Sequence, residues 1–219
     1  MKGLQAVIFD MDGVIVDSEP QHERAFLEVV RALGYAGAHG LRFSDYVGRS
    51  DRQLWVDFIA KHQPRQAVEE LAAMKRACLL ELIRREQRLF AGLPGLMAKL
   101  ATRYPMALAS GSERAIVEEV LRLGNLARFF AAVVTDTEVP RGKPAPDIFL
   151  RAAQLLGVAP EKCCVVEDSK PGVAAGLAAG MQVIAITNTH PAAELRAATR
   201  VAQSYEEIGR LLLGCSDHG

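Results

Sequence analysis

Two aspartates spaced Asp-x-Asp close the first apolar run of the chain. Residues 4–9 form a short apolar run that is rich in β-forming side chains, which predicts a strand covered on both faces. Asp10 and Asp12 follow this run directly. Side chains at the carboxyl end of such a strand lie where open α/β sheets gather ligands. The same pattern also fits a helix cap followed by an Asp-Gly turn. A catalytic pair of acids is therefore one of two hypotheses for this stretch.

Polar side chains also follow other apolar runs of the chain. If these runs are neighbouring parallel strands, their ends meet at one edge of the sheet, beside Asp10 and Asp12. The residues concerned are Ser110 and Gly111 after the run 106–110, Lys143 in the loop after the run 131–136, and Glu167 and Asp168 at the end of the run 163–168.

The converging charges predict a magnesium-dependent pocket for a phosphoryl group. Several carboxylates at one place repel each other unless a cation neutralises them, and oxygen ligands of this kind select Mg²⁺. Lys143 supplies a positive charge for a phosphate oxygen, and the Ser110 hydroxyl and the backbone amides near Gly111 can donate to the others. A carboxylate can attack phosphorus, so Asp10 is the candidate nucleophile. Asp12 is the candidate general acid and base.

The elements that must position these residues fall into two parts of the chain, which differ in the spacing of their apolar residues. From about residue 18 to residue 90, apolar residues recur at helical spacing. From residue 92 onward, short apolar runs alternate with helical segments, which predicts a parallel sheet. The predicted strands are 4–9, 106–110, 131–136, 163–168 and 182–187, and the predicted helices of this part include 113–123, 146–156, 191–198 and 205–213.

The fold class that follows is α/β, with a Rossmann-like, three-layer parallel-sheet core and an inserted helical cap. We expect the core at residues 1–15 and 92–219 and the cap domain at residues 16–91. Gly92, Pro94 and Gly95 mark one expected hinge between them.

Composition limits the class of partner. The chain has 219 residues, and 26 basic residues balance 26 acidic ones, which disfavours a nucleic-acid-binding surface. An acid comes too early for a signal-peptide core, and no apolar run is long enough to span a membrane. We therefore expect a cytoplasmic, monomeric protein that binds a small metabolite, but neither nucleic acid nor membrane. The four cysteines, Cys78, Cys163, Cys164 and Cys215, lack CxxC spacing and are expected to be reduced.

The motifs DMDGV, SGS, GKPAPD and VVEDS, in this order, resemble the four motifs of the haloacid dehalogenase superfamily, in its phosphatase and phosphomutase branch. The resemblance covers the whole chain, and the helical insertion is similar to the four-helix cap of the β-phosphoglucomutase and phosphoglycolate phosphatase group. It implies Mg²⁺ bound by the Asp10 carboxylate, the Asp12 backbone carbonyl and Asp168, with Glu167 beside them as part of the metal site. Asp12 stands where true dehalogenases lack an acid, which implies phosphate chemistry.

Some residues of the insertion resemble substrate-contacting positions of such caps, although single charged residues on helices more often lie on the surface. They are His22, Lys75 and one of two arginines, Arg49 or Arg52. A departure from the resemblance concerns Glu113 and Arg114, because β-phosphoglucomutases commonly carry a Lys-Asn pair there. This change implies the loss of a second phosphate grip.

We predict a Mg²⁺-dependent phosphatase that hydrolyses a small phosphorylated metabolite, a sugar phosphate in particular, through an aspartyl phosphate on Asp10. A phosphomutase of the β-phosphoglucomutase type is the alternative. A non-catalytic binding module is disfavoured, because such a protein would be expected to lose Asp10, Asp12 or Lys143.

Overall fold

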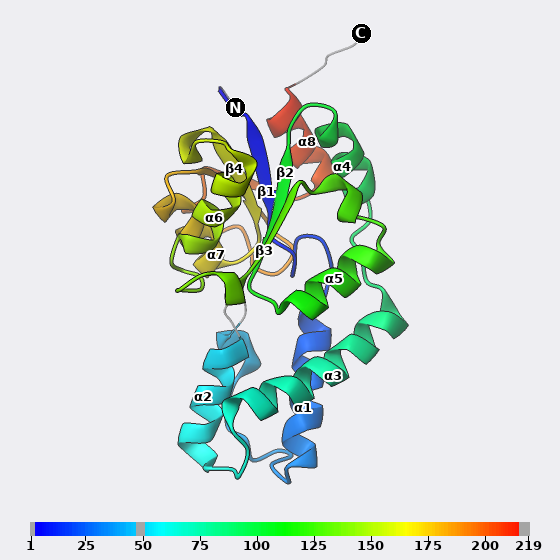
Figure 1. The fold of residues 1–219 in the computed structure, drawn as a ribbon, viewed down its shortest axis with the longest axis vertical. Helices are drawn as coiled ribbons and strands as arrows, with labels where there is room; N and C mark the ends of the chain where they lie inside the picture. The colour runs from blue at the N-terminus through cyan, green and yellow to red at the C-terminus, as the bar shows by residue number, and fades with distance from the viewer. Residues whose placement is uncertain (1–2, 47–50, 215–219) are drawn as a thin grey trace.

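The computed structural model describes residues 3–46 and 51–214 (Figure 1). Its centre is a six-stranded parallel sheet in the order β3-β2-β1-β4-β5-β6, which confirms the predicted α/β fold. Because β1 lies between β2 and β4, the residue that follows β1 has the ends of both neighbours beside it. The strands are β1 (Ala6–Phe9), β2 (Met106–Ser110), β3 (Ala132–Thr135), β4 (Cys163–Glu167), β5 (Gln182–Ile186) and β6 (Arg200–Ala202).

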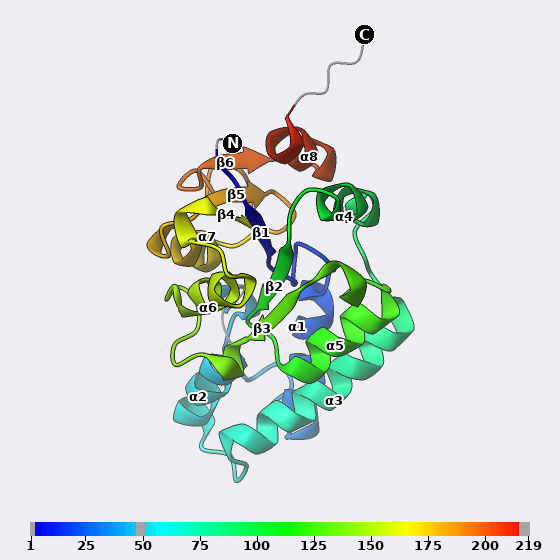
Figure 2. The same ribbon diagram turned by 45° about the horizontal axis from the view of Figure 1, so that its top comes forward.

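Helices cover both faces of the sheet (Figure 2). Val7 and Phe9 pack into one apolar cluster, and Ala6 and Ile8 into the other, as the alternation of side chains along a strand requires. The first cluster includes residues of α4 (Leu93–Ala101), α5 (Arg114–Leu123) and α8 (Tyr205–Leu213); the second includes residues of α6 (Asp147–Leu156) and α7 (Lys170–Ala178). The sheet is therefore the middle layer of three.

The insertion after β1 forms a separate helical unit at the end of the molecule away from α4 and α8 (Figure 1). Its described residues contain α1 (Glu19–Ala32), α2 (Asp51–His62), α3 (Val68–Glu86) and a single 3-10 turn, η1 (Phe43–Asp45). A four-helix cap is therefore not confirmed. Phe26, Trp55, Phe58 and Leu71 are fully buried in a core of its own.

Two chain segments connect the insertion to the sheet. Val16 forms an antiparallel bridge with Leu89, and the Asp17 amide donates to the Arg88 carbonyl at 2.9 Å. The Phe90 amide donates to the Ile15 carbonyl at 3.2 Å. The two crossings thus lie side by side, close to the expected domain boundary.

Three predictions differ from the structure. Residues 191–198 form turns in place of the expected helix, with the Leu195 amide donating to the carbonyl three residues earlier. Strand β6, which follows them, was not predicted. Pro94 and Gly95 lie in the first turn of α4 and not in a hinge, since proline is well tolerated where helix amides have no partner. Gly92 alone marks the junction, with a left-handed φ of +83°.

No helix among residues 3–46 and 51–214 combines the length and apolarity that crossing a membrane would require.

Candidate active site

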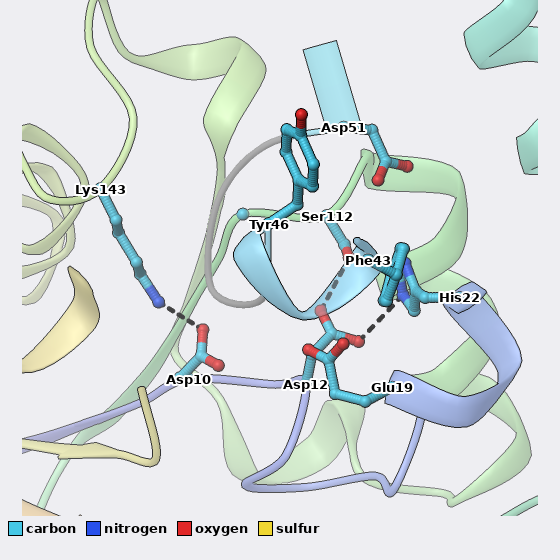
Figure 3. Close-up of a pocket in the computed structure, with 10 residues that line it drawn as sticks. Asp10, Asp12, Glu19, His22, Phe43, Tyr46, Asp51, Ser112 and Lys143 are labelled. Carbon is cyan, nitrogen blue, oxygen red and sulfur yellow. Dashed lines mark hydrogen bonds and ion pairs between the residues drawn. The ribbon is translucent and has the colours of Figure 1, made fainter. Parts of the chain in front are cut away.

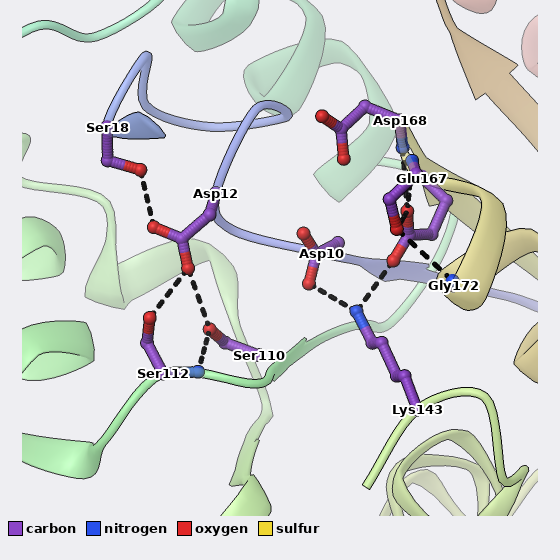
Figure 4. A network of polar contacts seen from close by, with 10 residues as sticks. Asp10, Asp12, Ser18, Ser110, Ser112, Lys143, Glu167, Asp168 and Gly172 are labelled. Atoms are coloured by element: carbon purple, nitrogen blue, oxygen red, sulfur yellow. Dashed lines mark hydrogen bonds and ion pairs between the residues drawn. The ribbon is translucent and has the colours of Figure 1, made fainter. Parts of the chain in front are cut away.

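The carboxyl end of β1 carries a buried group of charges. The Asp10 amide donates to the Val166 carbonyl of β4 at 3.0 Å, which fixes Asp10 against the neighbouring strand. Lys143 Nζ donates to Asp10 Oδ1 at 2.5 Å and to Glu167 Oε1 at 2.6 Å (Figure 4). Burial opposes the charge on Lys143, but the two carboxylates raise the pKa of the lysine above its usual range. The structure therefore holds a charged lysine between two acids.

Glu167 is fully engaged by protein groups. Its Oε2 accepts hydrogen bonds from the Asp168 amide at 2.8 Å, the Ser169 amide at 2.8 Å and the Ser169 hydroxyl at 2.9 Å. A Cβ on Gly172 would lie 1.7 Å from Glu167 Oε1, so only glycine fits at that position. The contacts bind Glu167 to Lys143 on one side and to the start of α7 on the other.

Oxygens of Asp10, Glu167 and Asp168 all lie within 4.8 Å of one another. Burial raises the pKa of Asp10 to about 8, against the opposing charge of Lys143. Burial, then the charge of Glu167, also raises the pKa of Asp168. Asp168 Oδ2 is buried without a hydrogen-bond partner. Such a donor set fits a hard divalent cation, which would satisfy the orphaned oxygen and neutralise the acids.

Gly13 allows the chain to pass close to this group. Its φ is +76°, and a Cβ there would lie 1.9 Å from Asp168 Oδ2. The glycine after the second aspartate is therefore required by both the backbone conformation and the space.

Asp12 faces a different set of partners from Asp10. Its carboxylate accepts hydrogen bonds from Ser18 Oγ at 2.5 Å, Ser112 Oγ at 2.7 Å and Ser110 Oγ at 3.4 Å, and His22 Nε2 lies 3.3 Å away. Burial would raise the pKa of Asp12, but His22 and the hydroxyl donors outweigh it and hold the pKa well below the usual range. Asp12 is thus stabilised as a carboxylate.

The Ser18 side chain does not cap the helix that follows it. It occupies the N-cap position of α1, where serine commonly accepts a hydrogen bond from the helix, yet its side chain makes no such bond. The hydroxyl donates to Asp12 instead. The start of the insertion is therefore tied directly to the acid.

His22 and Lys75 of the insertion form a chain of contacts that ends on Asp12. Lys75 Nζ lies 3.0 Å from His22 Nδ1 and pairs with Asp51, and the Lys75 side chain is completely buried. Burial and Lys75 lower the pKa of His22, but Asp12 raises it by more. Lys75 therefore lies behind His22 and acts on the site through it.

A cavity of about 40 Å³ lies between the insertion and the strand ends (Figure 3). A space of this size holds a few water molecules. The lining residues are Asp10, Asp12, Glu19, His22, Phe43, Tyr46, Asp51, Gly111, Ser112 and Lys143.

Most of the predicted site residues that the structure describes converge here. Arg52 is largely exposed, pairs with Glu69 at 3.1 Å and lines a neighbouring cavity in place of this one. Arg49 lies outside the described residues. Ser110 is fully buried, and its hydroxyl also accepts the Ser112 amide at 3.0 Å.

Sequence reasoning missed several residues of the site. Ser112 stands in the quoted motif SGS, and Ser18 and Glu19 follow Asp12 closely, so their nearness in sequence was an available signal. Asp51 carried no such signal, because only the packing of α2 against α3 brings it to Lys75.

Comparison with known proteins gives a consistent set of matches. A model of the haloacid dehalogenase-like hydrolases matches residues 4–180. Fructose-1-phosphate phosphatase YqaB of Escherichia coli is 35% identical, over 81% of this chain and 94% of its own. Hexitol phosphatase A of Escherichia coli is 33% identical, over 92% of this chain and 91% of its own. The crystal structure of a β-phosphoglucomutase from Clostridium difficile has a TM-score of 0.80 at 24% identity, covering 94% of this chain and 93% of that one.

Proposed function

The chain belongs to the haloacid dehalogenase-like hydrolases, and within that family we propose that it is a phosphatase of a small phosphorylated carbohydrate. The observation that carries the proposal is the placement of Asp10 against Lys143, with Asp12 beside them under the insertion. Two relatives that match over 81% and 92% of this chain are named as phosphatases of phosphorylated sugars or hexitols.

The proposed reaction has two displacements. In the first, a carboxylate oxygen of Asp10 bonds to phosphorus while the ester oxygen departs and takes a proton from Asp12. In the second, Asp12 takes a proton from water, the water oxygen bonds to phosphorus, and Asp10 leaves as a free carboxylate. Lys143 orients Asp10 and places its charge next to the phosphoryl oxygens.

A magnesium ion fits the acids of this site. We propose that Asp10, Asp168 and the backbone carbonyl of Asp12 would hold it, since Asp168 Oδ2 has no other partner. When bound, the ion supplies positive charge to the phosphoryl oxygens. Glu167 is better suited to hold Lys143 and the start of α7 than to bind the ion directly, because both of its oxygens are already engaged.

Hydrolysis is favoured over phosphoryl transfer between two positions of a sugar. Glu113 pairs with Arg76 of α3, and Arg114 pairs with Glu138 and donates to the Val133 carbonyl at 3.1 Å. Neither residue offers an unpaired charge to a second phosphate. The likeness to β-phosphoglucomutase, at 24% identity, is one of fold. A cytoplasmic location and a monomeric state remain predictions.

A panel of phosphorylated carbohydrates tests the proposal, with phosphate release and isomer formation measured in parallel. We expect phosphate release that stops in excess chelator and returns with Mg²⁺. Formation of glucose 6-phosphate from β-glucose 1-phosphate, faster than phosphate release, would favour the mutase. Binding without turnover of any ester would favour the non-catalytic module.

A further inference from the structure

A second cavity adjoins the catalytic one between the insertion and the core. It holds about 190 Å³, and Asp51 and Gly111 line both cavities. Its other walls include Val68 and Ala72 at the start of α3 and Asp136 on the core side. A group attached to a phosphate at Asp10 can therefore extend into this second space, which is several times larger than the first.

The acids of this second cavity differ in whether they already have partners. Glu69 pairs with Arg52 at 3.1 Å, Glu113 pairs with Arg76, and Asp51 pairs with Lys75. These pairings neutralise the three carboxylates by contacts within the protein.

Asp136 lacks such a pairing among the described residues. Its Oδ1 is buried and has no hydrogen-bond partner. Burying a carboxylate oxygen without a hydrogen-bond donor destabilises the folded protein, because the oxygen loses its hydration and gains no partner. Burial, followed by the charges of Asp51 and Glu113, raises the pKa of Asp136 to about 6, so the group is still largely ionised at neutral pH. Among residues 3–46 and 51–214 no cation pairs with this carboxylate, and Arg52, which also lines the cavity, pairs with Glu69.

The backbone around Asp136 holds this carboxyl group in place. Asp136 begins the 3-10 turn η3 (Asp136–Glu138) directly after β3, at the same edge of the sheet as Ser110 of β2. Thr135 and Glu138 form a reciprocal capping box across the turn. The backbone is therefore fixed, and because the Thr137 amide donates to this carboxyl group, the oxygen left for a ligand is Oδ1.

We propose that Asp136 is a specificity-determining residue that accepts a hydrogen bond from a hydroxyl of the leaving group. The inference rests on the proposed phosphatase function and names the class of ester: a neutral, polyhydroxylated leaving group such as a sugar or sugar alcohol. A carboxylate or second phosphate at the same position would meet the ionised Asp136 and is disfavoured, because Arg52, the cation of this cavity, is already paired with Glu69.

The experiment compares esters that differ only in hydroxyl groups. Sorbitol 6-phosphate and n-hexyl phosphate have the same chain length, and p-nitrophenyl phosphate is a third probe that draws little on this cavity. The ratio of kcat/KM for sorbitol 6-phosphate to that for n-hexyl phosphate is measured in the wild type, Asp136→Ala, Asp136→Asn and Glu161→Ala. Glu161 is exposed and precedes β4 at the opposite edge of the sheet, so its variant is the matched control.

We expect Asp136→Ala to lower that ratio about tenfold or more, mainly through KM, and to leave p-nitrophenyl phosphate turnover within about twofold. Asp136→Asn should recover part of the loss, because its amide oxygen still accepts a hydrogen bond. Both Asp136 variants should also improve the relative rate on phosphoglycolate, whose leaving group carries a carboxylate. Glu161→Ala should match the wild type on every ester.

An unchanged ratio in Asp136→Ala, in a protein whose wild type prefers sorbitol 6-phosphate, would overturn the role of Asp136 and leave the phosphatase proposal standing. Equal losses on all three esters would also overturn it, because they would indicate damage to the catalytic centre. A wild type that hydrolyses none of the three would instead contradict the proposed function. Unfolding by urea provides the check on folding, and we expect neither Asp136 variant to unfold at a lower concentration than the wild type.

Discussion

Glu167→Gln separates two roles for the buried carboxylate at the end of β4. The sequence motif places Glu167 among the metal ligands, whereas its contacts bind it to Lys143 and to the amides of Asp168 and Ser169. Glutamine keeps the shape and one carbonyl oxygen, which can still accept the three donors on the α7 side. Its amide nitrogen then faces Lys143, where two donors meet and the ion pair is lost.

The expected loss of stability follows from this geometry. Removing one partner of a buried ion pair costs about 3–5 kcal/mol, because the other charge remains buried. Here Lys143 keeps its bond to Asp10, and the three donors keep an acceptor, so we expect the free energy of unfolding to fall by about 2–4 kcal/mol. Displacement of Lys143 should lower kcat/KM about a hundredfold.

The assay follows urea unfolding by circular dichroism, since the one tryptophan, Trp55, lies in the insertion and reports on that unit alone. The Mg²⁺ concentration for half-maximal activity is measured on the same samples. We expect Glu167→Gln to change this Mg²⁺ concentration by no more than about twofold, and Asp168→Asn to raise it at least tenfold. Glu161→Gln, an exposed change before the same strand, is the control and should alter neither quantity. Unchanged stability together with a raised Mg²⁺ requirement in Glu167→Gln would refute the reasoning.

Three further substitutions test other parts of the structure. Asp10→Asn should abolish turnover while leaving the fold intact by circular dichroism, because the amide keeps the shape of the side chain but cannot attack phosphorus; phosphate release near the wild-type rate would exclude Asp10 as nucleophile. Gly13→Ala should lower the free energy of unfolding by about 1–3 kcal/mol and raise the Mg²⁺ requirement, because of its positive φ and the collision with Asp168; equal stability would contradict the geometry. Glu119→Gln should cost about 0.5–1 kcal/mol at pH 7, since hydrogen bonds from Arg122 and Arg84 hold the pKa of Glu119 at about 2. This pKa is lower than in the unfolded chain, so the contribution is complete above about pH 4.5 and fades as the pH falls toward 2; a difference in unfolding free energy that does not narrow there would refute the assignment.

The core of the fold could be predicted because most of its strands are marked by a pattern within their own residues. Residues 6–9 and 163–166 are apolar throughout, as strands covered on both faces require, and an acid follows each run. Strand β6 has three residues and begins with an exposed arginine, so no such pattern marks it. Residues 191–198 contain several alanines and a leucine, but Leu195 is buried against the core within a series of turns. Tertiary packing has overridden helix propensity there.

The residues of the candidate site also divide into those that the strand pattern predicts and those that only tertiary packing brings together. Asp10, Lys143 and Asp168 follow strands, and a parallel sheet brings the carboxyl ends of its strands together, so their meeting could be predicted without coordinates. Asp51 and Lys75 come from different helices, and only the packing of those helices sets their distance. Sequence spacing carries no such information, which is why Lys75 could be named from a resemblance while its partner was missed.

Asp12, the proposed general acid, lies where the two units meet, and its partners come from both units. Ser112 belongs to the core, Ser18 to the connection and His22 to the insertion. Burial raises the pKa of Asp12, and His22 is the strongest of the influences that lower it. The first displacement of the proposed reaction needs Asp12 in its protonated form, and His22 is the contact that most opposes this form. Lys75 and Asp51 fix the position of His22, so the protonation of the proposed acid depends on residues of the insertion as well as of the core.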